Sequence, residues 1–154
     1  MNIAQLLIPK NNVATVFDDS TLRQGLEKLK YHGYTAIPVV TRDNHYVGTV
    51  SEGDFLWYLV DQNNAEDPMK PIRIQSTETL YIRDILSIDR NPPLRINASI
   101  AEVISRAMRQ NFIPVIDDRE YFSGIVTRQD IIRYFYSRAD LSSQLQTSER
   151  IASK

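Results

Sequence analysis

The sequence predicts an α+β fold built from two tandem copies of one structural unit, and three repeated motifs support that prediction. An apolar-Pro-Val run at residues 37–40 (IPVV) returns at residues 113–116 (IPVI). At the same offset of 76 residues, GTVSEGD at residues 48–54 returns as GIVTRQD at residues 124–130. Upstream, TLRQ at residues 21–24 returns as SIAE at residues 99–102. Several motifs repeated in one order indicate that a whole unit is duplicated.

Each copy is predicted to contain a short helix, a strand, a longer helix, two strands and a closing helix. The longer helices have apolar side chains at helical spacing, which are Leu22, Leu26 and Leu29 in the first copy and Ile100, Ile104 and Ala107 in the second. Residues 21 and 24, and residues 99 and 102, have the spacing of a capping box. The second copy is two residues shorter between this helix and the IPV strand.

Two β-rich runs follow in each copy and predict a hairpin. They are residues 36–40 and 46–50 in the first copy and 113–116 and 121–126 in the second, separated by the turn-forming segments TRDN and DDRE. The closing helices are predicted to begin at Ser51 and Thr127. Their inner faces are predicted to hold Phe55, Leu56 and Leu59 in the first copy and Ile131, Ile132 and Phe135 in the second.

The predicted units are residues 1–60 and 81–138. Residues 61–80 between them are polar, contain Pro68 and Pro71, and are predicted to form a connector with an extended stretch at residues 72–74. Residues 139–154 are a polar C-terminal tail, predicted to be either a frayed helix end or disordered.

Composition excludes several function classes. The chain has 18 basic and 19 acidic side chains, so no charge excess indicates a nucleic-acid or membrane partner. It has no cysteine, no apolar run long enough to span a bilayer and no signal-peptide pattern, so we expect a cytoplasmic protein. His32 and His45 have no partner at metal-ligand spacing, so no metal site is expected. No P-loop, nucleophile elbow or dinucleotide-binding glycine pattern occurs, so catalysis is not expected.

Tandem β-α-β-β-α units, each with an apolar-Pro-Val strand and a closing Gly-x-Val-[Ser/Thr]-x-x-Asp motif, resemble a pair of CBS domains, also called a Bateman module. The similarity covers nearly the whole chain. The stand-alone pair also resembles small bacterial CBS-pair proteins, some of which bind cyclic di-AMP. The resemblance implies two repeats related by a pseudo-two-fold axis, two clefts between them, a non-catalytic role in binding adenine nucleotides, and assembly into a parallel or antiparallel homodimer.

The resemblance further implies composite clefts, in which the closing motif of one repeat faces the first strand and the pre-proline segment of the other. The main ligand-binding cleft is then lined by Ala14, Thr15, Tyr34, Thr35, Ala36, Ile37, Val126, Thr127, Arg128 and Asp130. A second, weaker site is lined by Ser51, Asp54, Phe112 and Ile113. The hydroxyl and carboxylate of each closing motif also have capping-box spacing. A structural role for these residues is therefore open as well, and both roles can hold at once.

Two features favour the first cleft. Arg128 stands where the first copy has Glu52, so a phosphate beside Thr127 gains a cation. The pre-proline segment of the first copy is the complete one, and its Tyr34 offers a ring to a base.

Two function classes stay open. The first is a sensor in which AMP, ADP, ATP or cyclic di-AMP changes the surface offered to an unidentified partner protein. The second is a ligand-independent dimerising scaffold with decayed sites. Aromatic residues of the closing helices are predicted to help form the homodimer interface, and these are Trp57, Tyr58, Tyr134, Phe135 and Tyr136. No cofactor is expected.

Overall fold

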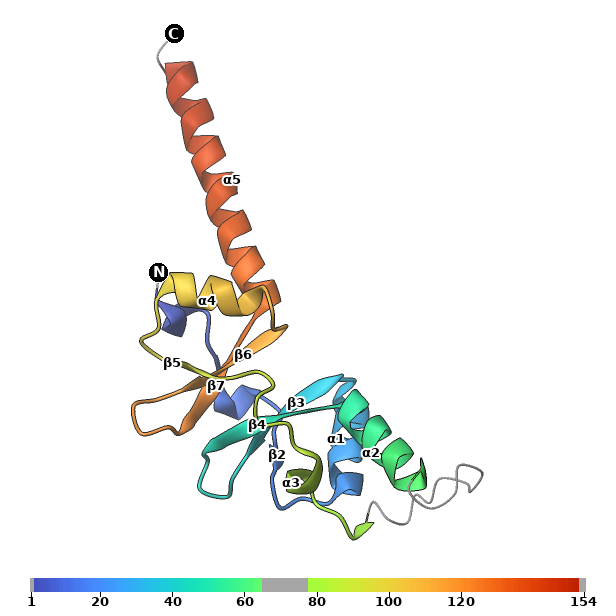
Figure 1. Ribbon diagram of the computed structural model, residues 1–154. Helices are drawn as coiled ribbons and strands as arrows, with labels where there is room; N and C mark the ends of the chain where they lie inside the picture. The colour runs from blue at the N-terminus through green and yellow to red at the C-terminus, as the bar shows by residue number, and fades with distance from the viewer. Residues whose placement is uncertain (1, 65–77, 153–154) are drawn as a thin grey trace.

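Two β-sheets with helices packed on them form the body of the protein (Figure 1). The computed structural model describes residues 2–64 and 78–152. The first half contains β2 (Val16–Phe17), α1 (Leu22–His32), β3 (Ala36–Val40), β4 (Tyr46–Ser51) and α2 (Glu52–Asn64). The second half repeats this order with β5 (Leu94–Arg95), α4 (Ile100–Ala107), β6 (Phe112–Ile116), β7 (Phe122–Thr127) and α5 (Arg128–Ala152). Ahead of β2 lie η1 (Ile3–Gln5), β1 (Ile8–Pro9) and η2 (Lys10–Asn12), and ahead of β5 lies α3 (Ile82–Ile85).

The two predicted hairpins are confirmed, and the fold is α+β. Strands β3 and β4 pair antiparallel with Ala36 opposite Ser51, and β6 and β7 pair with Phe112 opposite Thr127. Both ladders shift register at the corresponding place, between residues 39 and 40 and between residues 115 and 116. The β2 and β5 strands add in parallel to β3 and β6. The duplication therefore extends to the details of strand pairing.

The predicted helix starts are confirmed by complete capping boxes. Thr21 Oγ1 accepts from Gln24 N, and Ser99 Oγ accepts from Glu102 N, with the reciprocal side-chain bonds present in both. The α1 helix ends at Gly33, whose φ of 67° is a left-handed C-cap that favours glycine. The α4 helix has 8 residues against 11 in α1. The residues that the second copy lacks are therefore missing from this helix.

Each sequence repeat contributes its first short helix to the core of the other half. Ile3 from η1 packs with Val103 and the rest of the second core, whereas Ile82 from α3 packs with Leu22 in the first core. Strand β1 accordingly pairs with β7, with Ile8 opposite Ile125. The two halves in space thus exchange their leading segments, and this exchange ties them together.

Some residues predicted to face inward are exposed. Leu56, Ile132 and Phe135 are exposed on the closing helices, and Ile104 is exposed on α4. Each closing helix instead packs on its sheet through a narrower stripe, with Phe55 and Tyr58 in α2 and with Ile131 and Tyr134 in α5. On α4 the most deeply buried side chain is Val103. The apolar residues beside this stripe are therefore left available for other contacts.

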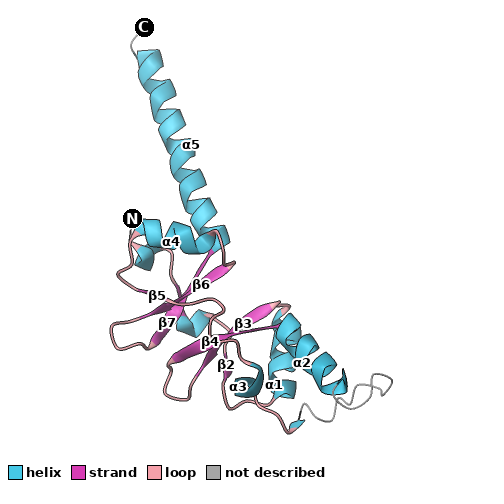
Figure 2. Cartoon of the chain, in the orientation of Figure 1, coloured by secondary structure: helices cyan, strands magenta, loops and turns pink. Residues whose placement is uncertain are grey.

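The α5 helix continues to Ala152 and projects away from the body of the protein (Figure 2). The predicted polar tail, residues 139–154, is therefore helical as far as Ala152, with no break after residue 138. Most of the predicted connector, including Pro68, Pro71 and the stretch at residues 72–74, lies outside the described residues. Among the described helices none has the length and apolar character needed to cross a membrane.

Candidate functional site

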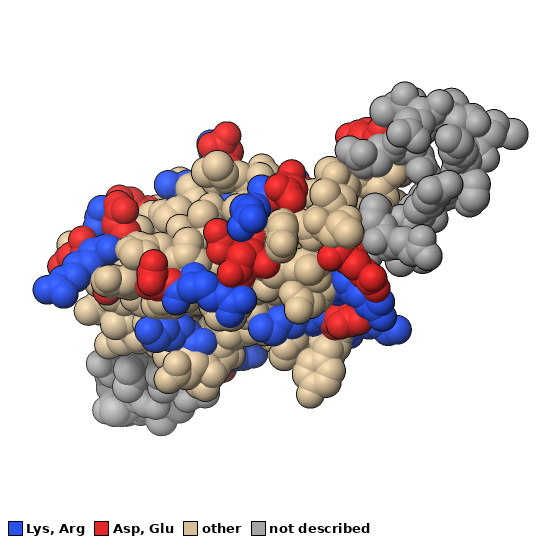
Figure 3. Space-filling model, turned by 90° about the horizontal axis from the view of Figure 1, so that it is seen from below, with Lys and Arg blue, Asp and Glu red and all other residues tan. Residues whose placement is uncertain are grey.

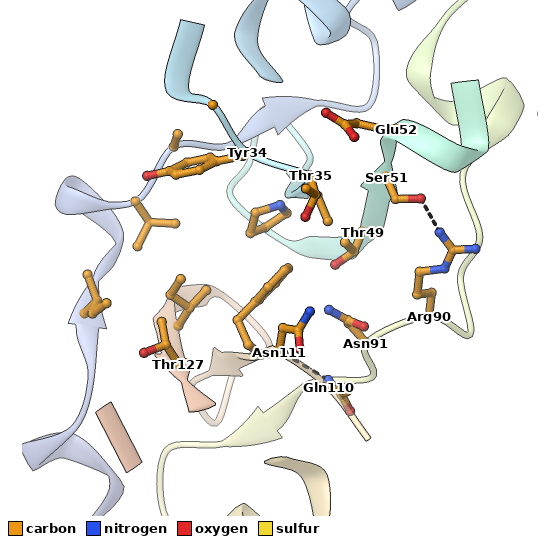
Figure 4. A pocket seen from close by; sticks show the side chains of 18 of the residues that line it. Tyr34, Thr35, Thr49, Ser51, Glu52, Arg90, Asn91, Gln110, Asn111 and Thr127 are labelled. Carbon is orange, nitrogen blue, oxygen red and sulfur yellow. Dashed lines mark hydrogen bonds between the residues drawn. The ribbon is translucent and has the colours of Figure 1, made fainter. Parts of the chain in front are cut away.

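A cavity of about 750 Å³ takes its walls from both repeats (Figure 4). Its apolar wall contains Ile8, Val13, Ala14, Pro38 and Ile125. Its polar lining includes Tyr34, Thr35, Thr49, Ser51, Glu52, Arg90, Asn91, Arg109, Gln110, Asn111 and Thr127. In Figure 4, Tyr34 and Thr127 lie on one side of the cavity, and Ser51 and Arg90 lie on the other. A volume of this size, with an apolar wall and a few polar groups, suits a small organic ligand.

Within the described chain, the edge of β3 that faces this cavity has no strand paired with it at Ala36. Thr35 O accepts a hydrogen bond from Glu52 N at 2.9 Å, and successive residues of an antiparallel ladder alternate in the edge to which their N–H and C=O point. Ala36, the next residue, therefore turns both groups away from β4. In the described chain, β2 pairs with β3 only at Val39 and Val40. The N–H and C=O of Ala36 are thus left facing the cavity that Ala36 lines.

The corresponding edge of β6 is covered by a side chain. Arg128 N donates to Asn111 O at 2.9 Å, so Phe112 turns its backbone groups to the outer edge of β6. Gln110 is buried, with 6% of its surface exposed, and its Nε2 donates to Phe112 O at 3.3 Å. At the position of Gln110 the first repeat has Tyr34, whose ring is half exposed and stacks on His32 with centroids 5.2 Å apart.

Both closing motifs cap their helices. Asp54 N donates to Ser51 Oγ at 3.3 Å while Ser51 N donates to Asp54 Oδ2 at 2.8 Å. Asp130 N donates to Thr127 Oγ1 at 3.1 Å, and that hydroxyl donates to Asp130 Oδ2 at 2.6 Å. The predicted structural role of these residues is confirmed, and each hydroxyl also lines the cavity.

Arg90, which the sequence reasoning missed, provides a cation on the Ser51 side of the cavity. Its Nη1 donates to Asp54 Oδ2 at 2.8 Å and to Ser51 Oγ at 2.5 Å. Arg90 lies between α3 and β5, so a residue of the second repeat contacts the closing motif of the first. A signal was available, because Asn91 beside it matches Asn12 in the first repeat and both asparagines line the cavity.

Arg128 does not line this cavity, contrary to the charge argument that favoured the first cleft. Its Nε donates to Ala107 O at 2.6 Å, so the guanidinium is directed to the end of α4. The short α4 leaves the carbonyl of Ala107 without a continuing helical turn, and Arg128 supplies the missing donor. Arg109 lines the cavity instead, and within the described part of the chain its guanidinium has no hydrogen-bond or ion-pair partner.

The predicted site residues fall into two groups. The cavity brings together Ala14, Tyr34, Thr35, Ala36 and Thr127 from the main cleft, and Ser51 and Phe112 from the weaker one. It does not include Thr15, Ile37, Val126, Arg128, Asp130, Asp54 or Ile113. The side chains of Ile37, Val126 and Ile113 are fully buried in the two cores. The two aspartates lie one turn inside their helices, bonded to their capping hydroxyls.

Tyr46 joins the repeats beside the cavity. Its hydroxyl donates to Asn91 O at 2.8 Å and lies 2.8 Å from Thr49 Oγ1. Burial raises the pKa of Tyr46 to about 12.

On the face shown in Figure 3, basic and acidic side chains are interspersed. In residues 2–64 and 78–152 no group of three or more His, Cys, Asp or Glu residues is placed to hold a metal ion.

Comparison with protein families matches the CBS domain model twice, at residues 3–61 and 82–137. The chain belongs to the CBS domain family. The two matched stretches place the Ile-Pro-Val strands and the closing motifs in the corresponding elements of two CBS domains. CBS-domain pairs are generally regulatory and non-catalytic.

Known CBS-pair proteins resemble this chain in sequence and fold. It is 24% identical over 131 residues to cyclic di-AMP receptor B of Bacillus subtilis, covering 85% of this chain and 84% of that protein. The structure of CbpB in complex with c-di-AMP has a TM-score of 0.80 at 23% identity, covering 94% of this chain and 91% of that one. That of CBSX2 in complex with AMP has a TM-score of 0.71 at 21% identity, covering 90% and 98%. The chain spans 59% of the length of one curated relative and 31% of another.

Proposed function

We propose that this CBS pair is a non-catalytic receptor for an adenine nucleotide. The observation that supports this most is the open edge of Ala36, which offers a backbone N–H and C=O side by side. Adenine presents a neighbouring donor and acceptor, N6–H and N7, whereas guanine presents two acceptors on the same edge. An apolar wall that includes Ala14 and Ile125 would cover the faces of the base.

Groups that suit the phosphate of a nucleotide lie in the same cavity, and a group that suits the ribose lies beside it. Thr127 lies at the start of α5, where the positive end of the helix dipole favours a phosphate. Arg109 adds a cation that has no competing partner in the described residues. Asp130 does not line the cavity but lies in the first turn of α5, bonded to Thr127, and its carboxylate is an acceptor of the kind that ribose hydroxyls need. The charge, the hydrogen-bonding groups and the size of the cavity thus all favour an adenine nucleotide.

We define half-site 1 as Ala14, Tyr34, Thr35, Ala36, Thr127 and Asp130, and half-site 2 as Ser51, Asp54, Arg90, Gln110 and Phe112. We propose half-site 1 as the main site, because the base-binding edge at Ala36 is open whereas Phe112 O is already bonded to Gln110. The sequence favoured the same half-site on account of Arg128 and of the complete pre-proline segment with Tyr34. Arg128 no longer supports this choice, because it does not line the cavity.

Calorimetric titration with AMP tests this placement. Asp130→Ala removes an anionic acceptor for the ribose, so we expect it to cost about 1.5–3 kcal/mol, or roughly ten- to a hundredfold in affinity. Asp54→Ala is the matched control and is expected to change affinity little. If the aspartates only cap helices, either substitution lowers stability by about 1 kcal/mol without a selective effect on binding. A larger loss at Asp54 would place the nucleotide in half-site 2, and equal losses would contradict half-site 1 as the main site.

Binding of the nucleotide would signal by changing the surface that the protein offers to a partner protein. A nucleotide that favours one arrangement of the two repeats shifts the population toward it, and a partner protein can respond to that arrangement. We expect this signalling to take place in the cytoplasm and in a homodimer. The alternative, a dimerising scaffold with decayed sites, is favoured if no nucleotide binds while the dimer persists.

A further inference from the structure

We propose that Arg90 and Gln110 fill half-site 2 with the chain's own side chains, and so limit each chain to one bound nucleotide. The inference rests on the proposed function, because it concerns the same cavity. Two clefts built by duplication would then bind nucleotides unequally, because the chain's own side chains fill only half-site 2.

The ribose-binding position of half-site 2 is occupied by Arg90. Asp54 Oδ2 receives three donors: Ser51 N at 2.8 Å, Ser51 Oγ at 3.0 Å and Arg90 Nη1 at 2.8 Å. The Asp54 side chain is 11% exposed and that of Arg90 is 43% exposed, so this ion pair is partly shielded from solvent. A ribose that approached Asp54 would have to displace the guanidinium.

The base-binding position of half-site 2 is occupied by Gln110. Its buried amide donates to Phe112 O, the carbonyl that corresponds to Ala36 O in half-site 1. An adenine amino group would compete with Gln110 for that oxygen. Gln110 and Arg90 therefore occupy both acceptors that a nucleoside would need, Phe112 O and the Asp54 carboxylate.

Half-site 1 has no equivalent of this arrangement. Asp130 also has an arginine partner, Arg133, with Nη1 at 3.1 Å from Oδ1. Arg133, however, is on the same helix three residues later, and its side chain is largely exposed. It does not cross between the repeats as Arg90 does, and solvent screens its pairing.

The difference between the half-sites arises from residues at equivalent positions. The pre-proline segment has Tyr34 in the first repeat and Gln110 in the second, and only the glutamine can cap the neighbouring carbonyl. The segment before the first strand of the repeat contains Arg90 in the second repeat, whereas the first repeat has Asn11 and Asn12 there. Asparagine is shorter than arginine and has no charge with which to hold Asp130.

Calorimetric titration with AMP tests the inference through the number of sites per chain. The variants are Arg90→Ser and the double variant Arg90→Ser, Gln110→Ala. Arg133→Ser is the matched control, since it breaks the arginine pairing at the other aspartate. Gln110 is buried, so the double variant is expected to be less stable, whereas the exposed position of Arg90 makes the single variant tolerable. Melting curves identify the folded variants.

We expect one AMP per chain for the native protein and for Arg133→Ser, and two for at least one Arg90 variant. Equal numbers in the native chain and in every folded variant overturn the inference, as does a second site in Arg133→Ser. If the native chain binds no AMP while an Arg90 variant binds one, the inference stands and the proposed function of half-site 1 is wrong.

Discussion

At the scale of single residues, Tyr46 shows how the repeats are joined beside the cavity. Its hydroxyl belongs to the first repeat and bonds a backbone carbonyl of the second, at Asn91. Because burial disfavours the phenolate, the pKa of Tyr46 lies at about 12, above the ordinary value of about 10. The protonated hydroxyl therefore links the two repeats. A movement of one repeat against the other would have to break or shift its hydrogen bond to Asn91 O.

The raised pKa of Tyr46 predicts a loss of stability in alkaline solution. Below about pH 10 Tyr46 is protonated in both the folded and the unfolded chain, and its contribution is complete. Between about pH 10 and the folded pKa of about 12, the unfolded chain loses the proton first, so the free energy of unfolding falls as the pH rises. Tyr46→Phe cannot ionise, and should lose less stability than the native chain between about pH 9 and about pH 11, measured by urea unfolding. At neutral pH the loss of its hydrogen bonds should cost about 1 kcal/mol. Identical pH dependence in both chains would show that Tyr46 does not stay protonated in the fold.

Single residues also show the limit of prediction from sequence. The sequence predicted Thr127 and Ser51 in two separate clefts, whereas both line one cavity. Each residue follows its hairpin directly, so its place at the end of the strand could be predicted, but the merging of the two clefts could not. The direction of Arg128 could not be expected, since it depends on an unpaired carbonyl at the end of a shortened helix. Arg90 was missed because it is distant in sequence from Asp54 and the signal beside it is a single matching asparagine, Asn91.

At the scale of elements, the helices and hairpins could be predicted because they depend on interactions between residues close in sequence. Capping boxes, turn residues and alternating apolar runs act within a few residues, and the helices and hairpins they predicted were found. The exchange of η1 and α3 between the halves could not be predicted in this way. Each copy carries a similar leading helix, so either core could receive it, and only the three-dimensional packing distinguishes the two arrangements.

At the scale of the whole molecule, the closing helices expose large aromatic and apolar side chains. Trp57 on α2 is 65% exposed, and Tyr136 on α5 is 71% exposed. A groove of about 720 Å³ between α4 and α5 is lined almost entirely by apolar side chains, among them Met108 and Ile132. Large exposed apolar areas commonly mark protein interaction sites. We therefore keep the prediction that the closing helices form a homodimer.

Light scattering tests this assembly. We expect a mass near twice 17.8 kDa at micromolar concentration. The double variant Trp57→Ser, Tyr136→Ser removes aromatic area from both helices and should shift the protein to monomer. Ile88→Ser is the matched control, because Ile88 is equally exposed but lies outside both helices. A native chain that stays monomeric, or a variant that dimerises as well as the control, would contradict the proposed interface.

The central claim, that the cavity receives an adenine nucleotide, is tested most directly by a thermal-shift screen of the native chain. AMP, ADP, ATP, cyclic di-AMP and S-adenosylmethionine are compared with GMP at millimolar concentration. A ligand at a hundred times its dissociation constant stabilises the fold by about 2.7 kcal/mol, which gives an easily measured rise in melting temperature. We expect at least one adenine compound to raise the melting temperature, and AMP to raise it more than GMP. No shift with any of the five adenine compounds, or a larger shift with GMP than with AMP, would contradict the claim.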